Sequence, residues 1–158
     1  MDTNKLTIIK ACAEELLTDL GVDFSVTVGD LEGEEGVSVN IESPQANLLI
    51  GYHAEALNAL QYFVGLMAEK KIGEWTKVII NIGDYRQRRE EQLRELAMSL
   101  AQKAVFSGEP QIANNLTPSE RRIVHIALAD HSDVVTESVG EGRDRHLMIK
   151  PKTPPPSE

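Results

Sequence analysis

Apolar residues recur at intervals of three and four along several stretches of this chain, which is the spacing of an amphipathic helix. The first stretch covers residues 3–20 and ends at Gly21, a residue that commonly follows a last helical turn. The same spacing predicts helices over residues 57–67 and 84–106 and from Pro118 onward. A short helix is expected near residues 43–47, with Ser43 as its cap and Pro44 in its first turn.

Alternation of apolar and polar residues predicts strands between these helices. Residues 24–28 and 37–41 alternate on either side of an acidic turn and predict a β-hairpin. A third strand is expected over residues 75–82. In the second half, a short strand at residues 111–113 precedes a helix, and residues 134–138 and 146–150 flank a glycine-rich turn as a second hairpin.

This order of elements predicts an α+β fold in two units. The first, over residues 3–83, runs helix, strand, strand, helix, helix, strand. The second, over residues 84–151, begins with the long helix and is expected to contain a three-stranded sheet. Residues 152–158 include three consecutive prolines and offer no apolar face, so we expect a disordered tail there.

A strong helix start lies at Thr117. Pro118 suits the first turn, and Thr117 can form a capping box with Glu120 three residues later. A helix that begins there carries Arg121 and His125 on one face, four residues apart. A guanidinium and an imidazole at this spacing can bind a phosphate, although the spacing alone favours an ordinary solvated face with a surface histidine.

Composition limits the class of protein. A chain of 158 residues with 41% hydrophobic content can form one ordinary domain or two small ones. No apolar run approaches the length of a membrane span, and residues 1–5 lack the features of a signal peptide, so we expect a cytoplasmic protein without membrane insertion. The single cysteine, Cys12, excludes an internal disulfide and is expected to be a packing residue.

The charge is distributed unevenly. The net charge is −9, which argues against broad attachment to nucleic acid. Residues 1–83 contain five lysines, no arginine and 13 acidic residues, a net charge of −8. Residues 84–158 contain 11 basic and 12 acidic residues, and every arginine is among them. Any phosphate-binding surface is therefore expected in the second half.

The first unit resembles a KH domain of the arrangement in which the extra helix and strand come first. The resemblance rests on the element order and on the loop Gly51-Tyr52-His53-Ala54. The family's loop is Gly-x-x-Gly with basic residues in the middle, whereas this loop ends in Ala54 and has no fixed positive charge. Tyr52 can stack on a base. Two interpretations stay open, RNA binding by the loop and a KH fold kept for packing or for pairing with a partner.

The second unit resembles the R-three-H domain, a single-stranded nucleic-acid-binding module. Arg121-x-x-x-His125 is followed by Thr136-x-Ser138 and by a glycine-rich segment that leads to Arg145. A KH unit joined to an R-three-H unit is the arrangement of the bacterial Jag (SpoIIIJ-associated) family, and the resemblance covers about residues 3–151. Members commonly carry an additional N-terminal Jag-N domain. We therefore expect a shortened member.

This resemblance implies binding of single-stranded RNA, or of single-stranded DNA, mainly through the backbone. Arg121 and His125 are the expected contacts, and the other candidates are four further arginines: Arg122, Arg145, Arg86 and Arg89. Arg86 and Arg89 fit surface ion pairs as well. Thr136 and Ser138 either hydrogen-bond phosphate or cap the turn. The alternative function is a protein-interaction module that pairs with another KH protein, with a second copy or with an assembly factor, its nucleic-acid binding being vestigial.

Catalysis finds little support in the sequence. The four histidines, His53, His125, His131 and His146, do not show the spacing of metal ligands. Ser119 lacks the surroundings of a nucleophile, and the Gly140-Glu141-Gly142 turn lacks the ending of a phosphate-binding loop. We therefore expect no enzyme, no metal and no cofactor.

Overall fold

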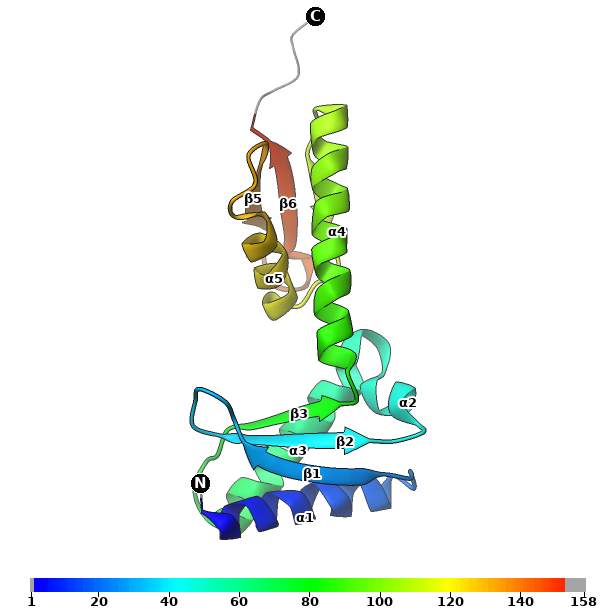
Figure 1. Ribbon diagram of the computed structural model, residues 1–158, viewed down its shortest axis with the longest axis vertical. Helices are drawn as coiled ribbons and strands as arrows, with labels where there is room; N and C mark the ends of the chain where they lie inside the picture. Colours follow the sequence, from blue (N-terminus) through cyan, green and yellow to red (C-terminus); the bar gives the residue numbers. More distant parts are fainter. Residues whose placement is uncertain (1, 153–158) are drawn as a thin grey trace, which may run out of the picture. The chain divides into compact units, whose positions relative to one another are not determined.

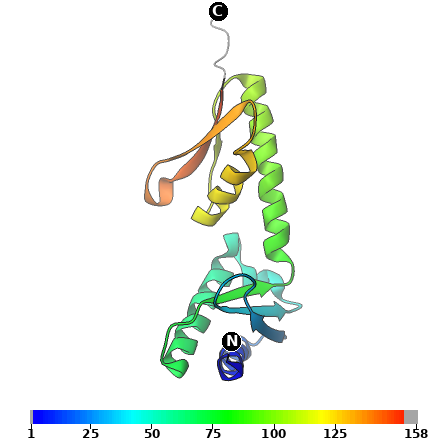
Figure 2. The ribbon, with the colours of Figure 1, turned by 60° about the vertical axis from the view of Figure 1, so that its left-hand side comes forward.

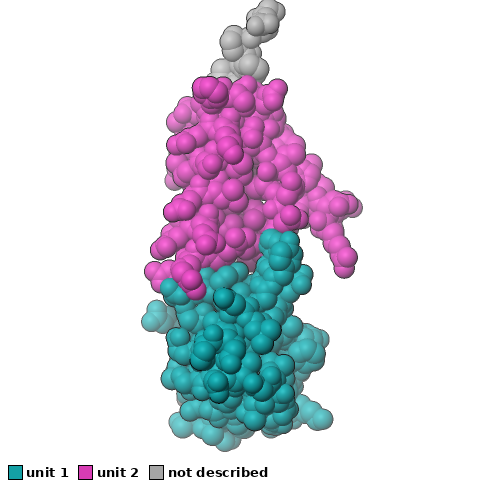
Figure 3. Space-filling view, turned by 90° about the vertical axis from the view of Figure 1, so that its right-hand side faces the viewer, with its two compact units in different colours: residues 1–86 teal, residues 87–158 magenta. Residues whose placement is uncertain are grey.

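The computed structural model describes residues 2–152 and forms two compact units, which divide between Arg86 and Gln87 (Figure 3). The tail expected over residues 152–158 lies, apart from Lys152, outside the described residues. Among residues 2–152, no helix combines the length and the hydrophobicity that a membrane span requires.

The first unit has the element order that the sequence predicts (Figure 1). Its elements are α1 (Thr3–Asp19), β1 (Ser25–Asp30), β2 (Val37–Glu42), α2 (Ala46–Ile50), the short 3-10 turn η1 (Tyr52–Ala54), α3 (Glu55–Ile72) and β3 (Val78–Ile82). The strands lie in the order β1-β2-β3, with β1 antiparallel and β3 parallel to β2.

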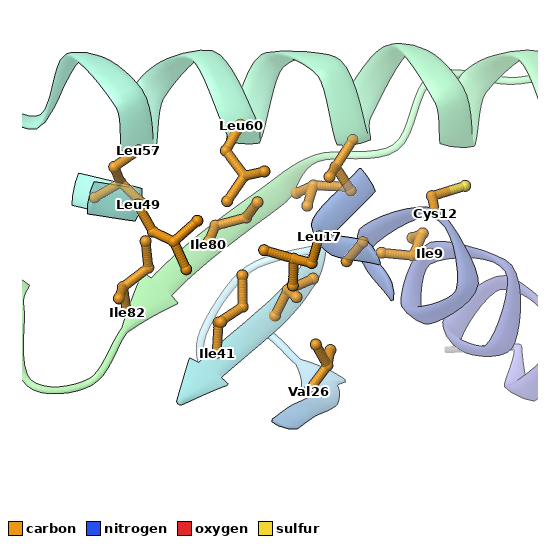
Figure 4. Packing of buried hydrophobic residues seen from close by; sticks show 14 of the residues in the cluster. Ile9, Cys12, Leu17, Val26, Ile41, Leu49, Leu57, Leu60, Ile80 and Ile82 are labelled. Atoms are coloured by element: carbon orange, nitrogen blue, oxygen red, sulfur yellow. The ribbon is translucent and has the colours of Figure 1, made fainter. Parts of the chain in front are cut away.

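The helices α1 and α3 cover one face of this sheet, and their apolar sides form the core with the strands (Figure 4). Ile9 and Leu17 of α1 and Ile41 and Ile80 of the sheet are almost completely buried there. Cys12 lies in the same core, where burial raises the pKa of its thiol. The opposite face is polar, since the amide of Asn81 donates a hydrogen bond to Asn40 across the strands at 2.9 Å.

Two local predictions in this unit were wrong. The short helix begins at Ala46 and has no side-chain cap, so Ser43 is not its N-cap. The Ser43 hydroxyl instead donates to the Asp23 carbonyl at 2.5 Å and accepts from the Gln45 amide, which ties the chain to the segment before β1. The third strand begins at Val78 rather than at Trp75, whose side chain is exposed.

The second unit contains a three-stranded sheet, as the sequence predicts. Its elements are α4 (Tyr85–Ser107), whose first two residues belong to the first unit, β4 (Gln111–Ala113), α5 (Pro118–Leu128), β5 (Val134–Val139), the 3-10 turn η2 (Gly142–Asp144) and β6 (His146–Pro151). The strands lie in the order β4-β6-β5, and both pairs are antiparallel.

The core of this unit lies between the sheet and the two helices α4 and α5 (Figure 2). Three of the buried residues of α4 are alanines, at positions 97, 101 and 104. Val124 and Leu128 of α5 are buried in the same core as Leu147 and Ile149 of β6. The polar side of α5 is left for other contacts.

Candidate nucleic-acid interface

The start of α5 is fixed by the predicted capping box. The Thr117 hydroxyl accepts from the Glu120 amide at 3.3 Å, and the Glu120 carboxylate accepts from the Thr117 amide at 2.9 Å. Pro118 occupies the first turn, where a missing N–H costs nothing. This start fixes which side chains of α5 lie on the same face as Arg121.

Arg121 and His125 are each held by a further contact. The guanidinium of Arg121 donates from Nη1 to the Leu116 carbonyl at 2.8 Å, and the residue is half-buried. One turn later, Nδ1 of His125 shares a hydrogen bond with the Thr136 hydroxyl on β5. The two side chains are therefore oriented before any ligand arrives, and Arg121 retains further N–H donors.

These two residues line one open hollow of about 340 Å³. We call it the arginine hollow, and it is lined by Pro118, Arg121, Arg122, His125, Thr136, Ser138 and Arg145. Three of these residues carry a permanent positive charge, and no carboxylate is among the seven. A concave site of one sign of charge attracts the opposite charge, so the hollow suits an anion in a protein that is itself acidic.

The hairpin β5–β6 supplies one wall of the arginine hollow. Thr136 and Ser138 are two residues apart on β5 and pair with Ile149 and Leu147 of β6, so they share the face that packs toward α5. They lie within the strand, not in the turn that follows it.

The turn after β5 brings Arg145 back to the arginine hollow. Gly140 has φ 87°, and a β-carbon at this position would lie 2.8 Å from the Asp144 carbonyl oxygen. Only glycine therefore fits this tight turn. Arg145 follows η2 and immediately precedes β6, and its side chain is exposed at the hollow.

Arg89 does not line the arginine hollow, but it supports the helix that does. Its Nε donates to the Glu120 carboxylate at 2.8 Å, and the two side chains are 27% and 12% exposed. Burial raises the pKa of Glu120, but the hydrogen bonds from Arg89 and from the Thr117 backbone outweigh this effect, so the pKa lies below its ordinary value. Arg89 thus joins α4 to the first turn of α5.

Arg86 is bound within the first unit. Its Nε donates to the Ile80 carbonyl at 3.1 Å, and its Nη2 donates to the Gln61 side chain at 3.1 Å. It is not among the residues that line the arginine hollow. Six arginine and histidine residues are expected RNA contacts outside the Gly51–Ala54 loop, and the structure brings together four of them, Arg121, Arg122, His125 and Arg145.

The loop Gly51–Ala54 has an unusual backbone. Gly51 has φ 70°, and a β-carbon there would lie 2.8 Å from the β-carbon of Ala56, so a glycine is required. His53 and Ala54 also take positive φ angles, 50° and 59°. The Tyr52 ring is exposed and meets the His53 ring edge to face, with centroids 4.0 Å apart. Its stacking on a base stays a prediction.

Sequence reasoning missed two features of the site. Pro118 lines the arginine hollow, although the sequence assigned it to the helix start alone. The ion pair between Arg89 and Glu120 was also missed, because the two residues are 31 positions apart. The capping box was the one signal in the sequence that the Glu120 carboxylate has a fixed position.

Comparison with known proteins places the arginine hollow in a recognised module. Residues 91–151 match the family model of the R-three-H domain, and every residue that lines the hollow falls within them. The chain is 33% identical over 161 residues to the RNA-binding protein KhpB of Clostridium symbiosum, covering 94% of this chain and 72% of that protein.

Two further relatives carry the same name. The RNA-binding protein KhpB of Bacillus subtilis is 32% identical over 123 residues, which cover 77% of this chain and 59% of that protein. The protein of that name from Lactiplantibacillus plantarum is 31% identical over 146 residues, or 90% of this chain and 44% of that protein. The chain thus spans about half the length of these two relatives.

Proposed function

The chain belongs to the KhpB (Jag) family, and from this premise we propose that it binds single-stranded RNA through the arginine hollow. The observation that carries the proposal is the set of three arginines and one histidine around a single hollow without a carboxylate. Because RNA is the proposed ligand, the cytoplasm is the proposed compartment.

Phosphate is the group that this set of side chains fits. Arg121 is anchored by the Leu116 carbonyl, so its remaining donors can meet phosphate oxygens at little cost in side-chain entropy. Arg122 lies on α5 and Arg145 immediately before β6, so phosphates can be neutralised from both walls of the hollow. Thr136 and Ser138 add neutral hydroxyls. Such contacts position a strand but carry no sequence information, so weak base preference is expected.

The test is a binding titration of a fluorescent single-stranded RNA with the full chain and with the double variant Arg121→Ala, His125→Ala. Loss of two phosphate contacts is expected to weaken binding about tenfold or more. Arg143→Ala is the matched control, because Arg143 is an exposed arginine of η2 outside the lining of the hollow. Its affinity should stay within about twofold of wild type.

Unchanged affinity in the double variant would remove the arginine hollow from the proposal. Equal losses in the double variant and in Arg143→Ala would show a diffuse charge effect and would also contradict a site at this position. A single-stranded DNA of the same sequence, titrated in parallel, shows whether the ribose hydroxyls contribute.

A different observation favours protein interaction as a second function. A hollow of about 370 Å³ in the first unit is lined by apolar residues of α1, α2 and α3 and of the segment after α1. Leu48 and Phe63 line it and are 67% and 53% exposed. We propose that this exposed apolar surface is a contact site for another protein, a second copy or a KH protein.

Light scattering on nuclease-treated protein tests this second function. A mass above that of one chain, reduced to one chain by Leu48→Ser with Phe63→Ser, would support it. A single-chain mass for wild type, with every partner from a lysate lost on nuclease treatment, would exclude it.

A further inference from the structure

The strand β3 lies at the edge of the first sheet, with β2 on one side of it. In a parallel strand, the N–H and C=O groups of one residue both point to the same side of the strand, and those of the next residue point to the opposite side. The Lys77 carbonyl accepts from Val37 at 2.8 Å, and the Gly83 amide donates to Ile41 at 3.0 Å, which fixes the alternation. Val78, Ile80 and Ile82 therefore turn their N–H and C=O groups away from β2, toward the free edge.

The central position of this free edge is occupied by two side chains. The Ile80 amide donates to Oε1 of Gln61 on α3 at 3.0 Å, and the Ile80 carbonyl accepts from Nε of Arg86 on α4 at 3.1 Å. Nη2 of Arg86 also donates to the same Gln61 oxygen at 3.1 Å. Gln61 and Arg86 thus supply the acceptor and the donor that a neighbouring strand would supply.

This position matters because β3 is short. It contains five residues, and its free edge has three ladder positions, of which Ile80 is the middle one. With Ile80 occupied, an incoming strand cannot form bonds at consecutive ladder positions. A cation beside the edge opposes strand addition further. Burial lowers the pKa of the Arg86 guanidinium, which nevertheless remains charged at neutral pH.

We propose that Gln61 and Arg86 form an edge cap that prevents β3 from pairing with the β3 edge of a second copy of this chain. This role goes beyond RNA binding and assigns Arg86 to the first unit's own architecture. Unprotected edge strands pair with one another, and proteins commonly block them with charged side chains. Here the block is made of hydrogen bonds to one residue, so a single substitution can open it.

Hydrogen exchange of the Ile80 amide in the full chain tests the cap directly. Gln61→Leu removes the acceptor and is expected to speed exchange at Ile80 by about tenfold or more. Gln61→Glu keeps an oxygen at the same place and should preserve slow exchange, because both hydrogen bonds use Oε1 as acceptor. The amides of Ile79 and Asn81, which face β2, serve as internal references for intact folding. Equal exchange at Ile80 in the Leu and Glu variants would overturn the proposal.

Sedimentation tests whether loss of the edge cap lets two copies of the chain associate. Gln61→Leu and Arg86→Ala should each self-associate with a dissociation constant about tenfold or more below that of wild type. The matched control is Arg94→Ala, which removes an exposed arginine of α4 paired with Glu90 and should behave as wild type. Faster exchange at Ile80 without stronger self-association would overturn the proposal.

RNA titration separates this proposal from the proposed function. Arg86→Ala should leave RNA affinity within about twofold of wild type, since Arg86 is outside the arginine hollow. If Arg86→Ala instead weakens RNA binding as much as the Arg121 and His125 double variant, with self-association unchanged, Arg86 is an RNA contact and the cap is refuted.

Discussion

At the scale of single residues, the arginines of this chain differ in the acceptor that the fold gives to each. Arg89 faces the Glu120 carboxylate, and Arg86 faces the Ile80 carbonyl and the Gln61 amide. Arg121 binds a backbone carbonyl, which orients its guanidinium without neutralising its charge. An arginine that is already paired with a carboxylate must give up that pair to bind phosphate, so the arginines of the arginine hollow are the better ligands.

Ala54 gives a prediction at this scale. Its φ of 59° lies in the left-handed region, where a β-carbon costs roughly 1–2 kcal/mol. Ala54→Gly removes this strain but makes the unfolded chain more flexible, which offsets part of the gain. We expect the free energy of unfolding to rise by about 0.5 kcal/mol, measured by urea denaturation.

The matched control for Ala54 is Ala59, an exposed residue within α3. Ala59→Gly should lower the free energy of unfolding by about 1 kcal/mol, because glycine is unfavourable in a helix interior. The same substitution should thus have opposite effects at two positions five residues apart. Destabilisation at both positions would show that the backbone at Ala54 carries no strain.

At the scale of elements, the first turn of α5 gives a prediction about pH. Glu120 has a pKa below its ordinary value in the folded protein, so its contribution to stability is present above the unfolded pKa and is lost as pH falls through the folded pKa. Acidification from pH 5 to pH 3 should therefore destabilise wild type. Glu120→Gln, which keeps a capping side chain, should reduce this loss by about 1 kcal/mol, the net contribution of a typical hydrogen bond.

Arg89→Ala is the companion variant, because it removes the donor and leaves the carboxylate. It should show the same reduced sensitivity to acid in urea denaturation at the two pH values. If both variants lose as much stability as wild type on acidification, the pair between α4 and α5 does not stabilise the folded state.

The elements themselves could be predicted largely from the sequence, because helix and strand periodicity decide which side of each segment is buried. The capping box at Thr117 was predictable as well, because its two residues are only three positions apart in the sequence. Ser43 was mispredicted because its hydroxyl bonds Asp23, twenty residues earlier, in place of a helix start. The side chains that Arg86 and Arg89 contact, Gln61 and Glu120, lie 25 and 31 residues away, and no local pattern encodes such contacts.

At the scale of the whole molecule, charge is separated between the two halves of the sequence. Residues 1–83 carry a net charge of −8 and residues 84–158 carry −1, yet the second half contains three arginines around one hollow. An acidic protein can bind an anion in this way, because salt screens distant charges more than nearby ones. The arginines around the hollow therefore act on the anion more strongly than the distant carboxylates do. Binding of RNA should therefore be local and limited to a few phosphates.

The salt dependence of RNA binding follows from this number of phosphates. Three arginines that each neutralise one phosphate of a single strand predict a slope of about −2 for log K against log salt concentration. Titrations of the full chain from about 50 to 300 mM salt measure this slope. Arg145→Ala should make the slope shallower by about 0.7, since one phosphate contact is lost, whereas Arg143→Ala should leave it unchanged. A wild-type slope near zero, or one that Arg145→Ala does not alter, would show that phosphates are not held in the arginine hollow.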